Sequence, residues 1–366
     1  MNCISGLKAI LEKQLGWHKS RIDFFAQALI GLMICRTINF REIAIVMPSS
    51  KANVDSNYRR IQRFFANFEI NFSDIACWIF RLFFSPKDML YISIDRTNWF
   101  WGKSKINIFM LSICYEGVAI PIYWKLLNKA GNSSGDEQIE LLERFVKHFG
   151  KSQIKAVLAD REFPNEKFIG WLVSEEIPFF FRVKRDVQVY IKDKKYKLTG
   201  EIFSKVKRSE QRVLNMCVNL YSQKLWLSAA RNERDELMII CTNDNPRIAI
   251  ASYLRRWEIE CLFQSLKGRG FRFEDTRVVE QNRIEKMLAL LAIGFAWAHK
   301  TGEWKAEKKP IFLKKIRKQK RPQYTYFRYG LDYLREKMNK SSVRLSAFKR
   351  LLRHLVPSAD VYWLKC

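Results

Sequence analysis

The spacing of hydrophobic residues changes from a helical to a strand period near Met89. In residues 5–85, apolar side chains recur every three or four positions, as at Leu7, Ile10 and Leu11, and this predicts amphipathic helices. After Met89, short apolar runs are bounded by turn residues, which is typical of strands. The pattern therefore predicts a helical N-terminal region followed by a region that contains a sheet.

The order of elements after Met89 predicts an α/β core of the ribonuclease-H-like type, a mixed sheet with flanking helices. We expect three strands, a helix and a fourth strand, over 89–95, 106–114, 118–124, 136–149 and 154–159. In this arrangement the first and fourth strands lie side by side, so that Asp95 and Asp160 come at adjacent strand ends. Two carboxylates held there repel each other strongly unless a cation lies between them.

Further changes of pattern divide the remainder of the chain. A helix and a strand are expected up to residue 184, and an antiparallel β insertion follows. A long helix from about Arg247 to Gly268 then resumes the α/β core. We predict five segments: a helical region, the first part of the core, the insertion, the second part of the core and a basic helical region, over 1–86, 87–184, 185–245, 246–300 and 301–366.

The charge of the chain favours a polyanionic partner. The 366 residues include 65 Lys and Arg against 37 Asp and Glu, a formal net charge of +28, and 48% are hydrophobic. This is too much apolar side chain for a disordered basic tail, so a packed protein with a positive surface is expected. Such a surface attracts nucleic acid, the commonest polyanion, and an enzyme of small neutral substrates fits poorly.

Cysteine and hydropathy patterns bear on the compartment. The eight cysteines form no CxxC pair and only four His are present, which favours free thiols in a reducing compartment over disulfides or a zinc site. The longest apolar stretches are shorter than the roughly 20 residues of a spanning helix, and the N-terminus lacks a clean signal core. We therefore expect a soluble, cytoplasmic protein without a membrane partner.

The expected helix over 247–268 carries its polar residues on one face. At about 100° per residue, four of them fall within an arc of about 60°: Tyr253, Arg256, Glu260 and Lys267. The opposite face is apolar and can pack on a sheet. An acid among cationic groups suits a metal-binding carboxylate near a phosphate backbone, although a solvated helix with exposed ion pairs is the alternative.

Two basic segments suggest further DNA contacts. A short helix over 58–65 follows a turn-rich stretch, and its Arg59, Arg60 and Arg63 suit a groove-binding unit, with a solvated basic face as an equal alternative. Residues 308–321 are dense in Lys and Arg and precede several aromatic residues. That mixture suits DNA contact by charge and stacking, with a solvated linker and helix as the alternative.

These residues resemble a known family. The spacing Tyr253-x2-Arg256-x3-Glu260-x6-Lys267 is similar to the YREK signature of bacterial insertion-sequence transposases of the DDE type, the insertion-sequence-four-like family. The acid in YISIDRTNWFWG and the DREF run at residues 160–163 look like the first and second acids of that family. The resemblance covers roughly residues 20–300 in order and spacing.

The resemblance implies a transposase that binds the ends of an insertion sequence, cuts DNA and joins the 3′ ends to target DNA by a cut-and-paste route. Asp95, Asp160 and Glu260 would be the catalytic triad and would hold two Mg²⁺ ions, with Mn²⁺ as a substitute. Carboxylates are the hard oxygen ligands that suit Mg²⁺. Two ions about 4 Å apart would stabilise both the attacking and the leaving oxygen of an in-line displacement.

The resemblance also implies DNA contacts. Contacts to the backbone of the transposon end would be made by Tyr253, Arg256 and Lys267, through an Arg fork and a Lys point charge. Arg161 is similarly placed in relatives, with a structural partnership to a carboxylate as the alternative. Some relatives stack a flipped base on a Trp of the insertion. Met238 stands at that position here, and Trp226 is the nearest alternative.

The implied partner is double-stranded DNA, both terminal inverted repeats and target, bound by a homodimer at the bacterial nucleoid. Two other functions stay open. One is a catalytically silent transposase relative kept as a DNA-binding or regulatory protein, which the presence of all three acids argues against. The other is a metal-dependent nuclease of RNA–DNA hybrids, and the basic extensions and the YREK helix favour transposition over it.

Overall fold

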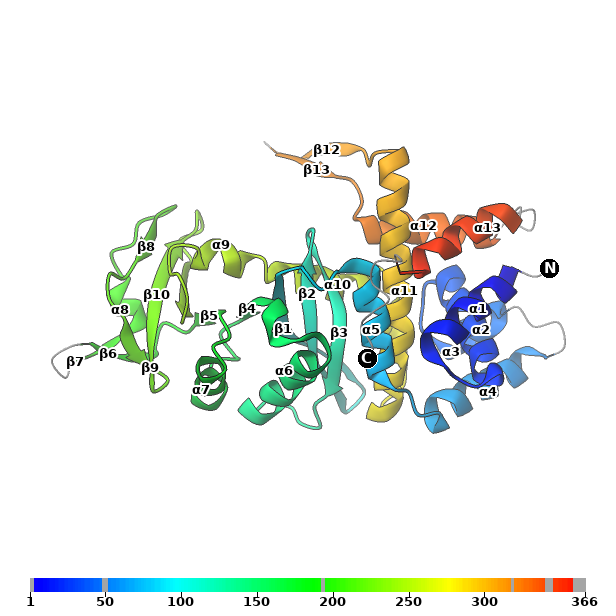
Figure 1. Ribbon diagram of the computed structural model, residues 1–366, viewed down its shortest axis with the longest axis horizontal. Coiled ribbons are helices and arrows are strands. Elements are labelled where there is room, and N and C mark those ends of the chain that lie inside the picture. The colour runs from blue at the N-terminus through cyan, green and yellow to red at the C-terminus, as the bar shows by residue number, and fades with distance from the viewer. Residues whose placement is uncertain (1–2, 48–51, 192–194, 317–318, 340–344, 358–366) are drawn as a thin grey trace. The chain divides into compact units, whose positions relative to one another are not determined.

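The computed structural model describes residues 3–47, 52–191, 195–316, 319–339 and 345–357, in a mixed α/β fold (Figure 1). The chain forms two compact units. The helical unit contains Met1–Ser85, Trp99–Ile106 and Phe263–Cys366, and the sheet unit contains Pro86–Asn98 and Asn107–Leu262. Each unit therefore draws on segments that lie far apart in the sequence.

Helices form the N-terminal part of the helical unit, as the hydrophobic spacing predicts. They are α1 (Cys3–Leu15), α2 (Lys19–Cys35), α3 (Phe40–Val46), α4 (Val54–Asn67) and α5 (Phe72–Phe83). Asparagine caps begin three of them, since the side chains of Asn39, Asn53 and Asn71 accept hydrogen bonds from backbone N–H groups of the following turn. These caps explain why the helices begin where they do.

The C-terminal part of the helical unit contains both helices and a β-ribbon. Its elements are η2 (Phe273–Asp275), α11 (Gln281–Lys308), β12 (Leu313–Ile316), β13 (Gln319–Pro322), α12 (Tyr326–Asn339), α13 (Leu345–Leu352) and η3 (Arg353–Leu355). The expectation of a wholly helical region from residue 301 is wrong for β12 and β13, which pair antiparallel. The Lys and Arg residues of this stretch do not recur at a spacing typical of helices or of strands. The density of charge therefore could not predict which type of element forms.

The core of the sheet unit contains five strands joined by loops and helices. The strands β1 (Leu90–Trp101), β2 (Ser104–Tyr115), β3 (Val118–Leu126), β4 (Ile154–Ala159) and β5 (Phe179–Val183) lie in the order β3-β2-β1-β4-β5. The connections include α6 (Gly135–Phe149), η1 (Lys151–Gln153) and α7 (Glu166–Ser174). The expected adjacency of the first and fourth strands is confirmed, because β1 and β4 pair in parallel.

The β insertion continues this sheet. It contains β6 (Gln188–Ile191), β7 (Lys195–Leu198), α8 (Thr199–Ile202), β8 (Gln211–Val213), β9 (Val218–Leu220), β10 (Gln223–Arg231) and β11 (Leu237–Thr242). The predicted antiparallel insertion is present, and it extends the core sheet, because β11 pairs antiparallel with β5 and the order continues β11-β10-β9-β6-β7. The strand period alone cannot tell which strand an insertion will pair with.

The single long helix expected over 247–268 is two helices, α9 (Ala249–Leu254) and α10 (Trp257–Leu266). At the break, the N–H of Arg255 bonds to Ser252 O and that of Arg256 to Tyr253 O, three residues back instead of four. The chain therefore turns between the two helices. A uniform 100° per residue does not hold across this turn.

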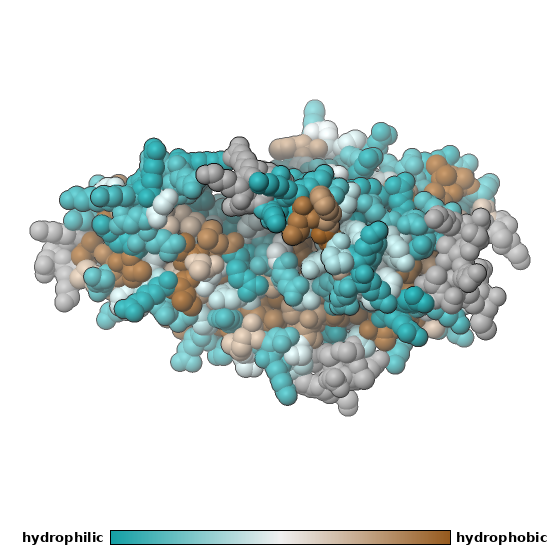
Figure 2. Space-filling view, turned by 90° about the horizontal axis from the view of Figure 1, so that it is seen from above, coloured by the Kyte–Doolittle hydropathy of each residue, from teal (hydrophilic) through white to brown (hydrophobic). Residues whose placement is uncertain are grey.

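The surface and the cysteines complete the description. Hydrophilic side chains cover most of the face in Figure 2, with small separate hydrophobic patches. No helix in the described ranges is long and apolar enough to cross a bilayer. Five thiols are free, those of Cys35, Cys114, Cys217, Cys241 and Cys261. The expectation of free thiols is wrong for Cys77, which is disulfide-bonded.

Candidate active site

Asp95 and Asp160 lie where the parallel pairing of β1 with β4 ends. β1 itself continues past Asp95 to Trp101, so the prediction that Asp95 stands at a strand end is wrong for the strand and holds only for this pairing. In the parallel pairing of β1 with β4, Ile94 lies opposite Ala159, and an aspartate follows each of these residues. The Oδ1 atom of each aspartate accepts a hydrogen bond from the N–H of the next residue, at 2.7 Å for Asp95 and 2.8 Å for Asp160. The backbone thereby orients both carboxylates at the end of the β1–β4 pairing.

Burial changes the acidity of Asp95. The residue is 7% exposed, and loss of hydration raises the pKa of Asp95 to about 7, although Arg256 and the N–H of Arg96 favour the ionised form. An additional cation bound to the Asp95 carboxylate would lower the pKa of Asp95 and favour its charged form further. A perturbed carboxylate of this kind is typical of functional sites, although structural ion pairs produce the same effect.

Arg256 links Asp95 to Glu260. Its Nη1 atom lies 2.5 Å from Asp95 Oδ2 and 3.5 Å from Glu260 Oε1. Arg256 is only 8% exposed, and its Nε has no hydrogen-bond partner among the described residues. Burial alone would lower the pKa of Arg256, but the neighbouring acids, Asp95 above all, hold it above its usual value. Arg256 is thus a buried cation between the first and third predicted acids.

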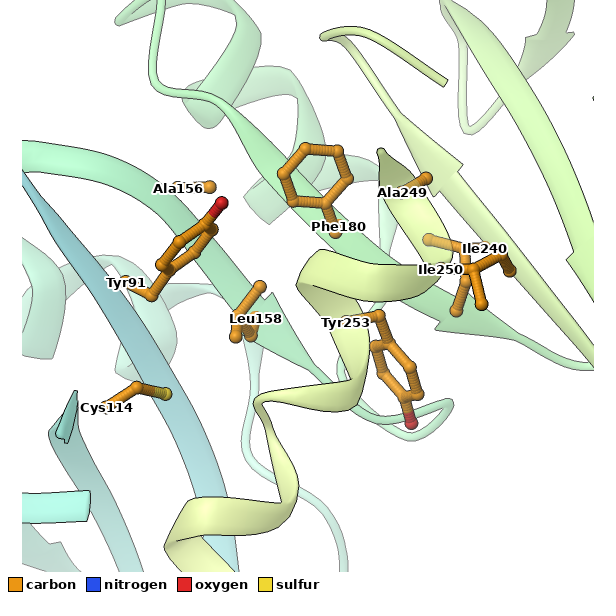
Figure 3. Close-up of a cluster of buried hydrophobic side chains, with 9 residues drawn as sticks. All are labelled: Tyr91, Cys114, Ala156, Leu158, Phe180, Ile240, Ala249, Ile250 and Tyr253. Atoms are coloured by element: carbon orange, nitrogen blue, oxygen red, sulfur yellow. The ribbon is translucent and has the colours of Figure 1, made fainter. Parts of the chain in front are cut away.

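Tyr253 and Arg182 contact the second acid. The Tyr253 hydroxyl donates to Asp160 Oδ1 at 3.1 Å, and Arg182 Nη1 lies 3.9 Å from the same atom. Figure 3 shows Tyr253 as a member of the buried cluster that packs α9 on the sheet, with its hydroxyl directed away from the other members. Burial raises the pKa of Tyr253 to about 12, so the hydroxyl keeps its proton and remains a donor.

A second ion pair joins the segments that follow the two aspartates. Arg96 comes directly after Asp95, and its guanidinium binds both carboxylate oxygens of Glu162, at 2.8 and 2.6 Å. It also donates to Asn107, Asn132 and the carbonyl of residue 131. This bidentate pair fixes one aspartate-bearing segment against the other. The sequence analysis missed it, although the DREF run itself contains Glu162.

A cavity of about 530 Å³ opens beside Tyr253 and Arg256. Its wall includes Met238, which the sequence analysis placed at the position of a base-stacking Trp, and Trp257, which is 60% exposed. Trp226 is not among the lining residues. It is half-buried on β10, opposite Thr242. The exposed aromatic side chain at this cavity is therefore Trp257, and no sequence pattern singled it out as a base-stacking residue.

A family model described as the transposase DDE domain matches residues 87–295. The chain belongs to this family. The solved structure of the piggyBac transposase synaptic complex with hairpin DNA gives a TM-score of 0.45 at 9% sequence identity, over 98% of this chain and 83% of that chain. Comparison with curated proteins gives no match. The family match confirms the predicted DDE transposase family. Membership of the insertion-sequence-four-like subgroup and a bacterial origin of the chain stay predictions.

Lys267 and Arg161 differ in their surroundings within this DDE family member. Lys267 belongs to the helical unit, where its Nζ lies 2.8 Å from Glu274 Oε1 and 5.1 Å from the centre of the Trp99 ring. The prediction that Lys267 shares a helix face with Tyr253 requires one continuous helix, and the break between α9 and α10 removes that condition. Arg161 is exposed and forms no ion pair within the described ranges.

The three arginines of α4 are not equivalent. Arg60 is held by Asp23, with Nη2 at 3.0 Å from Oδ2, and lies over the Phe24 ring. Arg59 and Arg63 are exposed. Arg60 thus has a partner within the helical bundle, whereas Arg59 and Arg63 remain accessible to a ligand. Residues 48–51 of the preceding turn lie outside the described residues.

The donor set suits a divalent cation by chemistry. In the described ranges no three His, Cys, Asp or Glu side chains lie close enough together to hold a metal ion. The carboxylates of Asp95, Asp160 and Glu260 are nevertheless hard oxygen donors of the kind that Mg²⁺ prefers. Asp95 and Glu260 already share one cationic group, the Arg256 guanidinium. A bound ion would compete with Arg256 for these two carboxylates.

Proposed function

We propose that this DDE-family chain is an active transposase that binds the ends of an insertion sequence, cuts DNA there and joins the 3′ ends to target DNA by a cut-and-paste route. One observation carries the proposal. Asp95 lies within β1 and Asp160 directly follows β4, both at the point where the parallel pairing of these strands ends, and Arg256 ties Glu260 to Asp95. The shared cation of Asp95 and Glu260, and the place of Asp160 on the strand paired with β1, support the proposal.

The proposed metal ligands are the three acids. Asp95, Asp160 and Glu260 would hold two Mg²⁺ ions, or Mn²⁺ in their place, which supply charge neutralisation and an activated water for phosphoryl transfer. The protein's own task is positioning. The Arg96–Glu162 pair keeps the two aspartate-bearing segments aligned, and the N–H of Arg96 orients the Asp95 carboxylate.

The proposed DNA contacts surround this group. Arg256 and Tyr253 offer a guanidinium fork and a hydroxyl donor to a phosphate of the cut strand. Arg161 is exposed directly after Asp160 and would contact the backbone on the other side. Lys267 remains a proposed contact only if DNA displaces its partner Glu274.

The cavity suits an extruded base if cleavage passes through a DNA hairpin. A flipped base needs an apolar or aromatic surface to replace its lost stacking. Trp257 and Met238 line the cavity and offer that surface. We therefore place the stacking role at Trp257 in preference to Trp226, which does not line the cavity.

The proposed substrate sets the remaining assignments. The net charge of +28 suits duplex DNA, both terminal repeats and target. Arg59 and Arg63 on α4 are proposed end-binding residues of the N-terminal helices. Assembly as a homodimer on paired ends, and action at the bacterial nucleoid in the cytoplasm, follow from the proposed family role.

Glu260→Gln tests the chemistry. It should abolish strand cleavage of a duplex that carries the DNA flanking this gene, because Gln cannot serve as an anionic metal ligand, while binding of the same duplex persists. Glu258→Gln, on the same helix, is the matched control, since Glu258 pairs with Arg255 at 3.2 Å and lies outside the triad. Cleavage and binding are measured with purified protein in Mg²⁺.

Donor-site excision in cells then tests the route. Amplification across the emptied junction should succeed with wild-type protein and fail with Glu260→Gln. Cleavage by Glu260→Gln would remove Glu260 from the triad. Binding without cleavage by the wild-type protein would favour the rival function, a catalytically silent DNA-binding regulator.

A further inference from the structure

The β12–β13 ribbon forms a sheet of its own. Its two strands pair antiparallel with each other, and no other strand in the described ranges joins them. Figure 1 shows the ribbon extending from the C-terminal end of α11. An isolated two-stranded hairpin is only marginally stable in water. A ligand that binds the ribbon would therefore also stabilise it.

Like charges face each other across the ribbon. Lys314 lies opposite Arg321, and Lys315 lies opposite Lys320. Because successive side chains of a strand point to opposite faces, each face carries one of these cationic pairs. Directly opposed like charges destabilise a strand pair. The pairing is thus opposed by the residues that form it, unless negative charge lies close by.

The described part of the chain does not supply that negative charge to the lysines. Lys314, Lys315 and Lys320 are exposed, and none of them forms an ion pair with a carboxylate of the described residues. Next to them, Phe312 is 70% and Leu313 50% exposed. Cations beside exposed apolar side chains are the combination that nucleic-acid surfaces use.

We propose that the β12–β13 ribbon enters the major groove of duplex DNA, so that each of its faces turns towards one phosphate backbone. The proposal rests on the proposed function for its substrate and adds the structural mode of contact. The strands lie about 4.8 Å apart, and the B-form major groove, about 12 Å wide, admits a two-stranded ribbon. Phosphates on both sides then neutralise both cationic pairs.

The mode of contact predicts its own selectivity. The contacts are to phosphates, so they add affinity without reading sequence. The major groove of A-form RNA is too deep and narrow for side chains to enter, so duplex RNA should not use the ribbon.

Lys315→Glu is the decisive variant. The new glutamate at position 315 lies opposite Lys320, and opposite charges across the strands favour the pairing. The same change removes one cation from the ribbon. In full-length Glu260→Gln protein, which leaves the DNA uncut, this change should weaken duplex binding and reduce the slope of log affinity against log salt by about one. Lys147→Glu, an exposed site on α6 with the same charge change, should leave the slope unchanged.

Chemical probing locates the groove. Guanine N7 faces the major groove, so bound protein should protect N7 from methylation, and Lys315→Glu should lose that protection. Equal salt slopes for Lys315→Glu and Lys147→Glu, or an unchanged methylation pattern, would overturn the proposal. The proposal would also be overturned if Lys315→Glu weakened binding to duplex RNA or to anionic phosphatidylserine vesicles as much as it weakened binding to duplex DNA. A ribbon that binds any polyanion equally well does not depend on the major groove.

The two proposals fail in different ways. If Glu260→Gln still cleaves, the triad is wrong, yet the ribbon still predicts the salt slope and the N7 protection. If the ribbon variants bind as the parent does, groove insertion is wrong, and the cleavage assay stands unaffected.

Discussion

Arg256 has two functions that the sequence motif does not separate. The motif indicates a contact to DNA phosphate, whereas the structure uses the same guanidinium to neutralise Asp95 in a buried setting. The Nε of Arg256 is buried and has no hydrogen-bond partner among the described residues. A phosphate or a metal ion that arrives at this site must therefore change an existing ion pair.

Replacement of Arg256 should reveal this pair in the free energy of unfolding. Arg256→Ala should lower it by roughly 2–4 kcal/mol, because removal of one partner leaves a buried charge unpaired. The loss should grow as the pH rises above about 7. Without Arg256 the native Asp95 holds its proton to higher pH, so the variant's native state binds more protons and its stability falls with pH relative to wild type.

A double-mutant cycle with Asp95→Asn isolates the interaction. The combined variant should recover part of the loss, and urea unfolding at pH 6 and pH 8 measures it. Strict additivity at both values would show that the two side chains do not interact.

At the scale of elements, close backbone approach decides where helices cross. A Cβ at Gly330 of α12 would collide with the backbone of Ala298 on α11, and one at Gly302 would collide with the backbone of Tyr326. Glycine at these crossings lets α11 and α12 pack against each other directly. The hydrophobic pattern predicts that helices form here, but it does not predict how closely the backbones of α11 and α12 approach each other.

Gly330→Ala should destabilise the helical unit by about 1–3 kcal/mol or more, because α12 must move away from α11. Gly131→Ala is the matched control, since its Cβ would meet nothing within 4 Å. Thermal unfolding by circular dichroism compares the two. Equal melting temperatures would mean that the helices tolerate a wider spacing.

At the scale of the molecule, the end of the described chain completes the helical unit. Two fully buried tryptophans donate their indole N–H groups to it: Trp78 to the carbonyl of Leu355 at 3.0 Å, and Trp297 to that of Leu351 at 2.9 Å. A buried indole N–H that loses its acceptor is desolvated without a hydrogen bond, and this lowers the stability of the folded state.

Truncation after Asn339 should therefore lower the melting temperature and shift tryptophan emission to longer wavelength. Truncation after Pro357 keeps both acceptors and should give a higher melting temperature than truncation after Asn339. Emission spectra and melting curves of the two shortened proteins make the comparison. Identical behaviour of both would show that α13 and η3 contribute little to the unit.

The sequence by itself determined the elements with a strong period and the acids at their ends. Alternation and turn residues gave β1 to β5 in order, and the topology this implied placed Asp95 beside Asp160, because side-chain period and strand direction are local properties. The YREK spacing likewise led to the DDE family, which the family match confirms.

Tertiary structure decided what depends on partners far along the chain. The break before α10, the extension of the sheet through β11, the Arg96–Glu162 pair, the Lys267–Glu274 pair and the exposed place of Trp257 at the cavity all arise from contacts between distant segments. No local pattern encodes such contacts, because a residue's burial and charge partners exist only once the chain has folded. The sequence thus identified the acids, and the fold determined which cation each of them meets.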